Sequence, residues 1–341
     1  MIYLNCDYLE GCHPAVLKKL NETNLEQTIG YGEDHYCKQA AEMIKQAFDC
    51  PDSAVHYLVG GTQANTTIIA AALRPSEGVL CADTGHINVH ETGAIESSGH
   101  KCLAMPNVNG VITAQQVRDA VALQADDEHV VKPGMVSISM STEVGTVYTR
   151  QQLKELYEAC QELGLYLYID GARLGCGLAA PGCDVTAADI AKYSDAFTVG
   201  GTKLGALFGE AMVISSKELN RNFRYMIKQR GGMLAKGRLL GLQYIALMEN
   251  DLYFQLGHKT VQQALSIRKA LEEKGISMLI DSPTNQQFPI FTQEQLDVIS
   301  RDFNLAFWEK LPDGRSAVRV CTSWATPDEY VEKFIQTVKA L

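Results

Sequence analysis

The chain has 341 residues, of which 46% are hydrophobic and 21% are charged. This composition is typical of a globular protein with one large and one smaller domain, or with two domains. The formal charge of −10 argues against nucleic acid or an anionic membrane as a partner, because both bind basic surfaces. Small anionic ligands are not excluded, since a local site counts for more than net charge.

The first fourteen residues, MIYLNCDYLEGCHP, contain no positively charged segment followed by an apolar one, so no signal peptide is predicted. No apolar run approaches the length of a membrane span. The ten cysteines form no CxxC pair, and histidine spacing typical of metal sites is absent. We therefore expect reduced, mostly buried thiols, no bound metal and a cytoplasmic location.

Short apolar runs then alternate with helical patterns. Strands are predicted over 54–60, 78–83, 135–141, 163–171, 195–201 and 211–215, and helices over 30–48, 62–73 and 150–164. Such alternation predicts an α/β fold with a mostly parallel sheet and helices on both faces.

The pattern changes toward the C-terminus. Helices are predicted over 260–275 and 327–341, and strands over 276–280, 288–291, 303–308 and 316–324. This mixture predicts a small α+β domain. We expect an N-terminal segment over residues 1–45, a large domain over 46–254 and the small domain over 255–341.

Four polar clusters directly follow predicted strands. They are GGTQ (60–63), STE (141–143), DGAR (170–173) and GGTK (200–203). Open α/β sheets bind ligands at the carboxyl ends of their strands. We therefore expect the four clusters to form one site.

The first cluster is suited to a phosphate. Gly60, Gly61 and Thr62 place bare backbone N–H groups and a hydroxyl at the start of a helix. The alternative is a tight strand–helix turn without a ligand. The cluster is neither GxGxxG nor a Walker loop, so it does not indicate a nucleotide.

The other clusters are each ambiguous when taken alone. Asp170 can face a cationic ring nitrogen and Arg173 can hold a carboxylate, or the two can be part of an internal salt bridge or a cap. Lys203 is either a solvated loop residue or a nucleophile in a partly desolvated pocket. His86 can stack on a planar ring, and Arg319 is either a surface residue or a second carboxylate clamp. Together, these groups are the parts that pyridoxal 5'-phosphate requires.

On these residues the sequence resembles the pyridoxal-phosphate-dependent threonine aldolases. They belong to the fold type I (aspartate aminotransferase-like) group, which also contains β-eliminating lyases. The resemblance runs nearly end to end, through LNCDYLEGCHP, YGED, GGTQAN, GHINVHETGA, STEVGTVYT, DGARL, TK and VRVCTSW. STEVGTVYT, GGTKLGALFGEA and RYMIKQRGGMLAKGR are most similar to the branch that includes phenylserine aldolase.

The resemblance implies roles for matching residues. Lys203 is expected to form the Schiff base, Asp170 to pair with the pyridinium and His86 to stack on the ring. The cofactor site is further expected to contain Gly61, Thr62, Gln63 and Arg230, and the substrate site Cys6, Tyr31, Arg173 and Arg319. Family members are typically homotetramers or homodimers with sites at a subunit interface, across which Tyr31 and Arg230 are expected to act.

Two positions depart from the family pattern. Cys6 stands where a serine usually contacts the substrate carboxylate, and Glu143 stands where many members have a histidine assigned to the β-hydroxyl. The general base is therefore open between His86, Glu143, an ordered water and a phosphate oxygen.

The activity implied is cleavage of L-3-hydroxy amino acids, of the threonine, allo-threonine or 3-phenylserine type, to glycine and an aldehyde. The alternative within the group is β-elimination, which releases ammonia and a keto acid. A ligand-binding homologue without activity is a third reading, and intact Lys203 and Asp170 argue against it.

Overall fold

The centre of the molecule is a seven-stranded sheet with the strand order β2-β8-β7-β6-β5-β3-β4. The structure, a computed structural model, describes residues 1–124 and 127–341. The strands are β2 (Ala54–Leu58), β3 (Glu77–Ala82), β4 (Cys102–Met105), β5 (Lys132–Ser139), β6 (Tyr166–Asp170), β7 (Ala196–Gly200) and β8 (Glu210–Ile214). In this sheet β8 runs opposite to the other six strands, so the prediction of an α/β fold with a mostly parallel sheet is confirmed.

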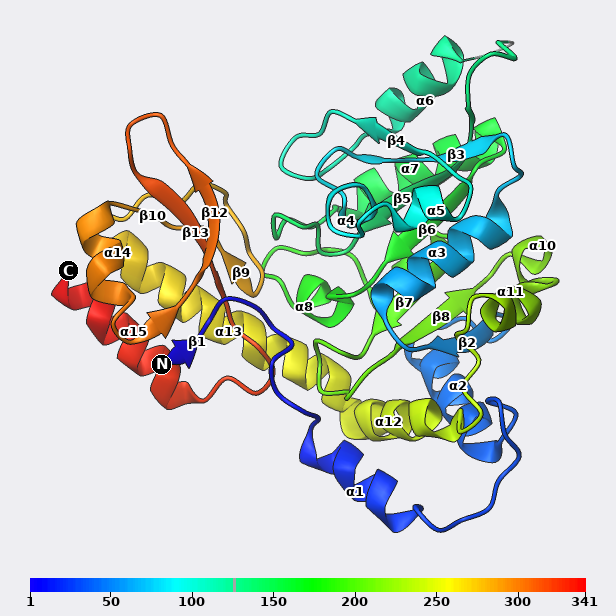
Figure 1. The fold of residues 1–341 in the computed structure, drawn as a ribbon, viewed down its shortest axis with the longest axis horizontal. Helices are drawn as coiled ribbons and strands as arrows, with labels where there is room; N and C mark the ends of the chain where they lie inside the picture. The colour runs from blue at the N-terminus through cyan, green and yellow to red at the C-terminus, as the bar shows by residue number, and fades with distance from the viewer. Residues whose placement is uncertain (125–126) are drawn as a thin grey trace.

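Helices cover both faces of this sheet (Figure 1). One apolar core contains residues of α1 (Pro14–Glu22), α2 (His35–Ala47), α6 (Ala114–Leu123), α7 (Arg150–Leu163), α9 (Ala187–Lys192) and α12 (Arg238–Met248). The core on the opposite face contains residues of α3 (Gly61–Ala72), α5 (Ala94–Ser97), α10 (Lys217–Asn220) and α11 (Phe223–Gln229). Burial on both faces explains why the strands read as continuous apolar runs.

Local sequence explains how these helices begin. The α7 helix starts at a capping box between Thr149 and Gln152 and ends at Gly164, whose φ is 69°. The α3 helix differs, because its N-cap is Gly60 and no side chain caps its first turn. Its first N–H groups are therefore left for another partner.

The C-terminal region packs on the long helix α13 (Leu252–Glu273). It contains β9 (Gln286–Gln287), β10 (Ile290–Phe291), α14 (Gln293–Ile299), β11 (Phe303–Asn304), β12 (Ala306–Lys310), β13 (Ser316–Cys321) and α15 (Asp328–Ala340). The N-terminal strand β1 (Ile2–Tyr3) pairs with β11, so both chain ends lie in this region (Figure 1). The predicted boundary between residues 254 and 255 falls in the first turn of α13.

Several elements differ from the prediction or were absent from it, among them α6 and α9. Residues 276–280 form no strand, and only an isolated bridge joins Met278 to Pro289. The edge strand β4 and the short helix α14 were not predicted, because each is too short for a periodic apolar pattern.

The α13 helix also contacts the short helix α8 (Leu174–Leu178). Their backbones meet at Gly257 and Gly175, where a Cβ on residue 257 would collide with the carbonyl of Gly175. Within the described residues, none of the helices combines the length and apolar character needed to cross a bilayer. All ten cysteines lie in the described ranges as free thiols, and eight of them are buried.

Candidate active site

A cavity of about 380 Å³ lies at the carboxyl edge of the sheet. It unites all four polar clusters that follow predicted strands. The lining residues are Tyr8, Val59, Gly60, Gly61, Thr62, His86, His90, Glu143, Asp170, Ala172, Thr202, Lys203, Phe208 and Glu210. The cavity therefore contains a nucleophilic amine, several carboxyl groups, imidazoles and a bare helix N-terminus.

The N-terminus of α3 forms an open cradle in this cavity. A Cβ added to Gly60 or to Gly61 would meet no atom within 4 Å. Uncapped N–H groups and the dipole of a twelve-residue helix both favour an anion at this point. The cradle thus fits a phosphate group.

Asp170 is held by two hydrogen bonds at the end of β6. Its Oδ2 accepts from Nδ2 of Asn65 at 3.0 Å, and its Oδ1 accepts from the backbone N–H of Ala172 at 2.9 Å. Asn65, which is fully buried, also accepts a hydrogen bond from the Tyr168 hydroxyl at 2.7 Å. Both carboxylate oxygens are therefore fixed, and the carboxylate lines the cavity.

The same asparagine connects Asp170 to His86. Nδ2 of Asn65 donates to Oε1 of Glu91 at 2.7 Å, and this oxygen also accepts from Nδ1 of His86 at 2.7 Å. Burial opposes a charged imidazole, but the hydrogen bond to Glu91 and the charges of Glu143 and Asp170 outweigh it and raise the pKa of His86. The ring is thus oriented by a buried network.

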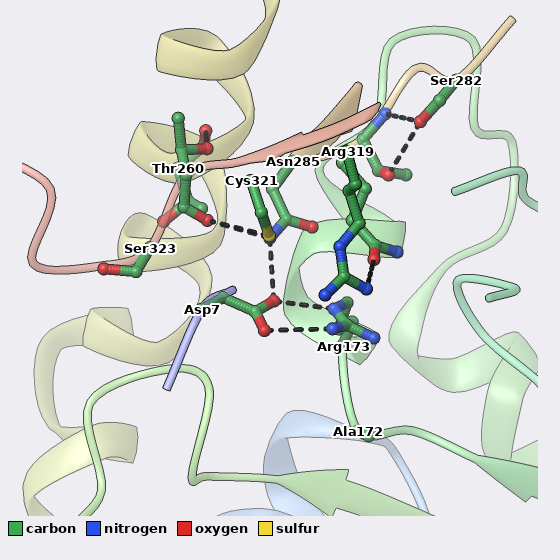
Figure 2. Close-up of polar contacts among 12 residues, drawn as sticks. Asp7, Ala172, Arg173, Thr260, Ser282, Asn285, Arg319, Cys321 and Ser323 are labelled. Atoms are coloured by element: carbon green, nitrogen blue, oxygen red, sulfur yellow. Dashed lines mark hydrogen bonds and ion pairs between the residues drawn. The ribbon is translucent and has the colours of Figure 1, made fainter. Parts of the chain in front are cut away.

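Arg173 pairs with a residue from the N-terminal segment. Its Nε donates to Oδ2 of Asp7 at 2.7 Å and its Nη2 to Oδ1 at 3.0 Å (Figure 2). Asn285 donates a further hydrogen bond to Asp7 at 3.0 Å. The sequence left open whether Arg173 binds a substrate carboxylate or forms an internal salt bridge with Asp170. The structure shows an internal salt bridge of Arg173, but its partner is Asp7.

The Asp7–Arg173 pair is buried, and the charge of each residue stabilises the charge of the other. Burial raises the pKa of Asp7, but the guanidinium of Arg173 and the charge of Lys203 more than offset it and hold that pKa well below its usual range. Asp7 and Arg173 are 1% and 5% exposed, so neither has water as a substitute partner. Arg173 therefore lies beside the cavity with two of its three nitrogens already occupied.

Arg319 lies on β13 in the C-terminal region. Its Nη1 donates to Oε1 of Gln286 at 3.2 Å and its Nη2 to the carbonyl of Asn5 at 3.0 Å. Figure 2 places its guanidinium next to that of Arg173. Cys6 is close enough that the charge of Arg319 lowers its pKa, although burial and other contacts leave the pKa of Cys6 raised.

Six predicted site residues are absent from the cavity lining, namely Cys6, Tyr31, Gln63, Arg173, Arg230 and Arg319. Gln63 donates to the carbonyl of Arg230 at 3.3 Å, which places Arg230 beside the first turn of α3. Tyr31 is 47% exposed on a neighbouring surface and does not reach the cavity within this chain.

Asn65, Glu91, Asp7 and Glu210 were not predicted from the sequence. Asn65 lies one helical turn after the glycine cradle and Glu91 five residues after His86, so both fall in quoted motifs. Their polar side chains are recognisable as site residues only from their burial, since sequence spacing does not show what they contact.

The cradle, the amine and the carboxylate together define a class of protein, the pyridoxal-phosphate-dependent enzymes with the aspartate aminotransferase-like fold. The chain belongs to the family described as beta-eliminating lyase, whose model matches residues 6–292.

Similar proteins agree with this assignment. The low specificity L-threonine aldolase of Pseudomonas aeruginosa is 29% identical over 98% of this chain and 96% of its own length. A solved structure of Leishmania major threonine aldolase is 41% identical, with a TM-score of 0.98 over 100% of this chain and 99% of that one. An aspartate aminotransferase of Thermus thermophilus shares the fold, with a TM-score of 0.73 at 14% identity over 100% of this chain and 96% of its own.

Proposed function

We propose that this protein cleaves L-3-hydroxy amino acids between Cα and Cβ, giving glycine and an aldehyde, with pyridoxal 5'-phosphate as cofactor. The observation that carries this proposal is the single cavity that unites the α3 cradle, Lys203, Asp170, His86 and Glu143. The extent of similarity to threonine aldolases, over nearly the whole chain, supports it over β-elimination.

Different residues of the cavity are suited to different parts of the cofactor. Gly61 and Thr62 would bind its phosphate, Lys203 would hold it through the side-chain amine, and His86 would stack on its ring. Asp170 would hold a proton at the ring nitrogen, since hydrogen bonds from Asn65 and Ala172 fix its carboxylate in the cavity. The chemistry that pyridoxal phosphate would supply at this site is an electron sink for the Cα–Cβ cleavage.

Arg173 and Arg319 orient the substrate through its carboxylate. They come from different parts of the chain, one beside the large sheet and one on β13, so a carboxylate between them is held from two sides. Fixing this end of the substrate determines which bond at Cα is set to break. Cys6, beside Arg319, contributes to the same end of the site.

Glu143 is proposed as the base that takes the proton of the β-hydroxyl. It lines the cavity next to His86, whose raised pKa favours the imidazolium and makes the histidine a poorer proton acceptor. The carboxylate acts on the hydroxyl directly or through one water.

Product analysis tests the reaction. The purified protein, supplied with the cofactor, is assayed against stereoisomers of 3-hydroxy amino acids. Stoichiometric glycine and aldehyde are expected. Keto acid and ammonia would instead identify a β-eliminating lyase. A protein that takes up no pyridoxal phosphate and stays colourless would contradict both readings.

Lys203→Ala is the decisive variant for the cofactor site. Loss of the side-chain amine is expected to abolish the visible absorbance of the attached cofactor and essentially all turnover. Normal turnover in this variant would refute the role of Lys203.

We further propose a cytoplasmic homotetramer or homodimer in which Tyr31 and Arg230 act across a subunit interface. The exposure of Tyr31 on the chain surface and the position of Arg230 beside the cradle support this arrangement. Sedimentation analysis measures the assembly, and a monomer that turns over at full rate would refute it.

A further inference from the structure

The backbone segment that carries Lys203, the Lys203 loop, joins β7 to β8 over residues 201–209. Gly200 and Glu210 pair in register at its base, and its residues Lys203 and Phe208 line the cavity. A lysine side chain is long and flexible. The place that its amine reaches therefore depends on how firmly the backbone of this loop is held.

Tyr244 of α12 binds the strand backbone at both ends of the Lys203 loop. Its hydroxyl donates to the carbonyl of Val199 at 2.5 Å, with the carbonyl oxygen of Gly209 at 3.1 Å, and accepts from the N–H of Ala211 at 2.9 Å. The side chain is fully buried, so water cannot take its place. One phenol thus joins the end of β7 to the start of β8.

Gln243, the preceding residue of α12, binds the second half of the loop. Its Oε1 accepts from the N–H of Leu207 at 2.7 Å, and its Nε2 donates to the carbonyl of Phe208 at 3.2 Å. Gln243 is also fully buried. Removing its amide would leave a backbone donor and a backbone acceptor unsatisfied, which is costly away from water.

Backbone hydrogen bonds extend this anchoring to Lys203. The N–H of Gly201 donates to the carbonyl of Gly209 at 3.1 Å, and the N–H of Leu204, directly after Lys203, donates to the carbonyl of Gly201 at 2.9 Å. The loop also lies close against α12, since a Cβ on Gly201 would come within 2.9 Å of the Tyr244 hydroxyl. The position of Lys203 therefore depends on the contacts of the loop with α12.

We propose that Gln243 and Tyr244 are positioning residues that hold the Lys203 amine where the cofactor binds. Neither is among the described residues that line the cavity, so both act through the loop and do not touch cofactor or substrate. The inference rests on the proposed function, in which Lys203 holds the cofactor. Displacing a reacting group by about 1 Å can lower the rate of its reaction by a factor of about 100.

A comparison of two ligands tests this role on the full chain freed of cofactor. Pyridoxal phosphate is added, and its attachment to Lys203 is followed by borohydride trapping and peptide mass analysis. Pyridoxine 5'-phosphate has the same ring and phosphate but no aldehyde, so it measures binding without attachment. In Gln243→Leu the rate of attachment is expected to fall by about tenfold, while the Kd for pyridoxine 5'-phosphate is expected to stay unchanged.

Tyr244→Phe tests the same role with a smaller disturbance, because it removes one oxygen and keeps the aromatic ring in the core. Attachment is expected to slow by about threefold to tenfold, as for the loss of one hydrogen bond, again with an unchanged Kd for pyridoxine 5'-phosphate. This variant keeps the test decisive if Gln243→Leu does not fold.

Gln263→Leu is the matched control. Gln263 is a buried glutamine of α13 whose Nε2 donates to the carbonyl of Thr326 at 3.0 Å, outside the Lys203 loop and the cavity lining. Its substitution is expected to lower the free energy of unfolding, as Gln243→Leu does, and to leave attachment unchanged. Urea unfolding of both variants measures the two losses of stability.

The outcomes separate the two proposals. Attachment to Lys203 at the unmodified rate in Gln243→Leu or, should that variant not fold, in Tyr244→Phe would overturn the positioning role and leave the proposed function intact. An equal weakening of pyridoxine 5'-phosphate binding, or an equal slowing in Gln263→Leu, would also overturn it, because the effect would then not be confined to the Lys203 loop. Attachment of the unmodified protein at another lysine would overturn the assignment of Lys203 itself.

Discussion

At the scale of single residues, the buried Asp7–Arg173 pair is expected to contribute to stability. Asp7→Asn leaves a buried guanidinium without its counter-charge, which costs about 3–5 kcal/mol of unfolding free energy. Urea unfolding near neutral pH measures this loss. Glu162→Gln, which breaks an exposed pair with Arg118, is the matched control and is expected to cost less than about 1 kcal/mol. Equal losses in the two variants would contradict the prediction.

The same pair predicts a dependence on acid. The pKa of Asp7 in the folded chain lies below its unfolded value, so its contribution is present above the unfolded pKa of about 3.9 and is lost as the pH falls toward the folded one. Unfolding of the unmodified protein at decreasing pH is therefore expected to converge with that of Asp7→Asn. A constant difference between them down to strongly acidic pH would contradict this.

Glu143 is tested by a nearly isosteric change. Glu143→Gln removes the proton acceptor but keeps the shape, so cleavage is expected to slow by about a hundredfold or more, within the range of general-base catalysis. The absorbance of the attached cofactor and glycine binding should stay unchanged. An unimpaired variant would return the role of base to His86 or to a water.

Substitution by lysine is expected to have different effects at Arg319 and at Arg173. Arg319→Lys keeps the charge but loses the planar fork, which is expected to weaken substrate binding by about 1.5–3 kcal/mol while the fold is retained. Arg173→Lys should lose stability as well, because two of its nitrogens bind Asp7. Substrate dissociation constants and unfolding curves measure both effects. Unfolded Arg319→Lys protein would indicate a structural role instead.

At the scale of elements, the start of α3 offers a test that separates binding from folding. Gly61→Ala adds a methyl group that meets no protein atom within 4 Å but projects into the cradle. Cofactor affinity is expected to fall at least tenfold while stability is kept, since alanine is a good helix residue. Gly164→Ala, at a helix end with φ of 69°, should instead cost about 1–2 kcal/mol of stability and leave affinity unchanged.

Elements and side chains differed in how far the sequence predicted them. Apolar runs in the sequence predicted the strands β5, β6 and β7. The helix α7 was predicted from its apolar periodicity and its terminal glycine. The role of Asn65 was not predicted, because its three partners are Tyr168, Glu91 and Asp170, which come together only in the folded chain. Asp7 was missed for the same reason, being 166 residues from Arg173.

At the scale of the whole molecule, the sequence motifs bear on which substrate is preferred. The sequence motifs that resemble the phenylserine aldolase branch predict better cleavage of β-aryl than of β-methyl substrates. The measurement is kcat/KM for 3-phenylserine against threonine, with the same enzyme preparation. Faster cleavage of threonine would refute the branch assignment and leave the reaction itself unaffected.

The contact between Gly257 and Gly175 has a mechanical consequence for the substrate site. α8 begins directly after Arg173, and α13 supports the region that carries Arg319. Because two glycines meet there without side chains between them, the distance between the two arginines depends on how closely the backbones of α8 and α13 approach each other. A side chain at residue 257 would therefore displace α13 from α8 and change the gap between the two arginines.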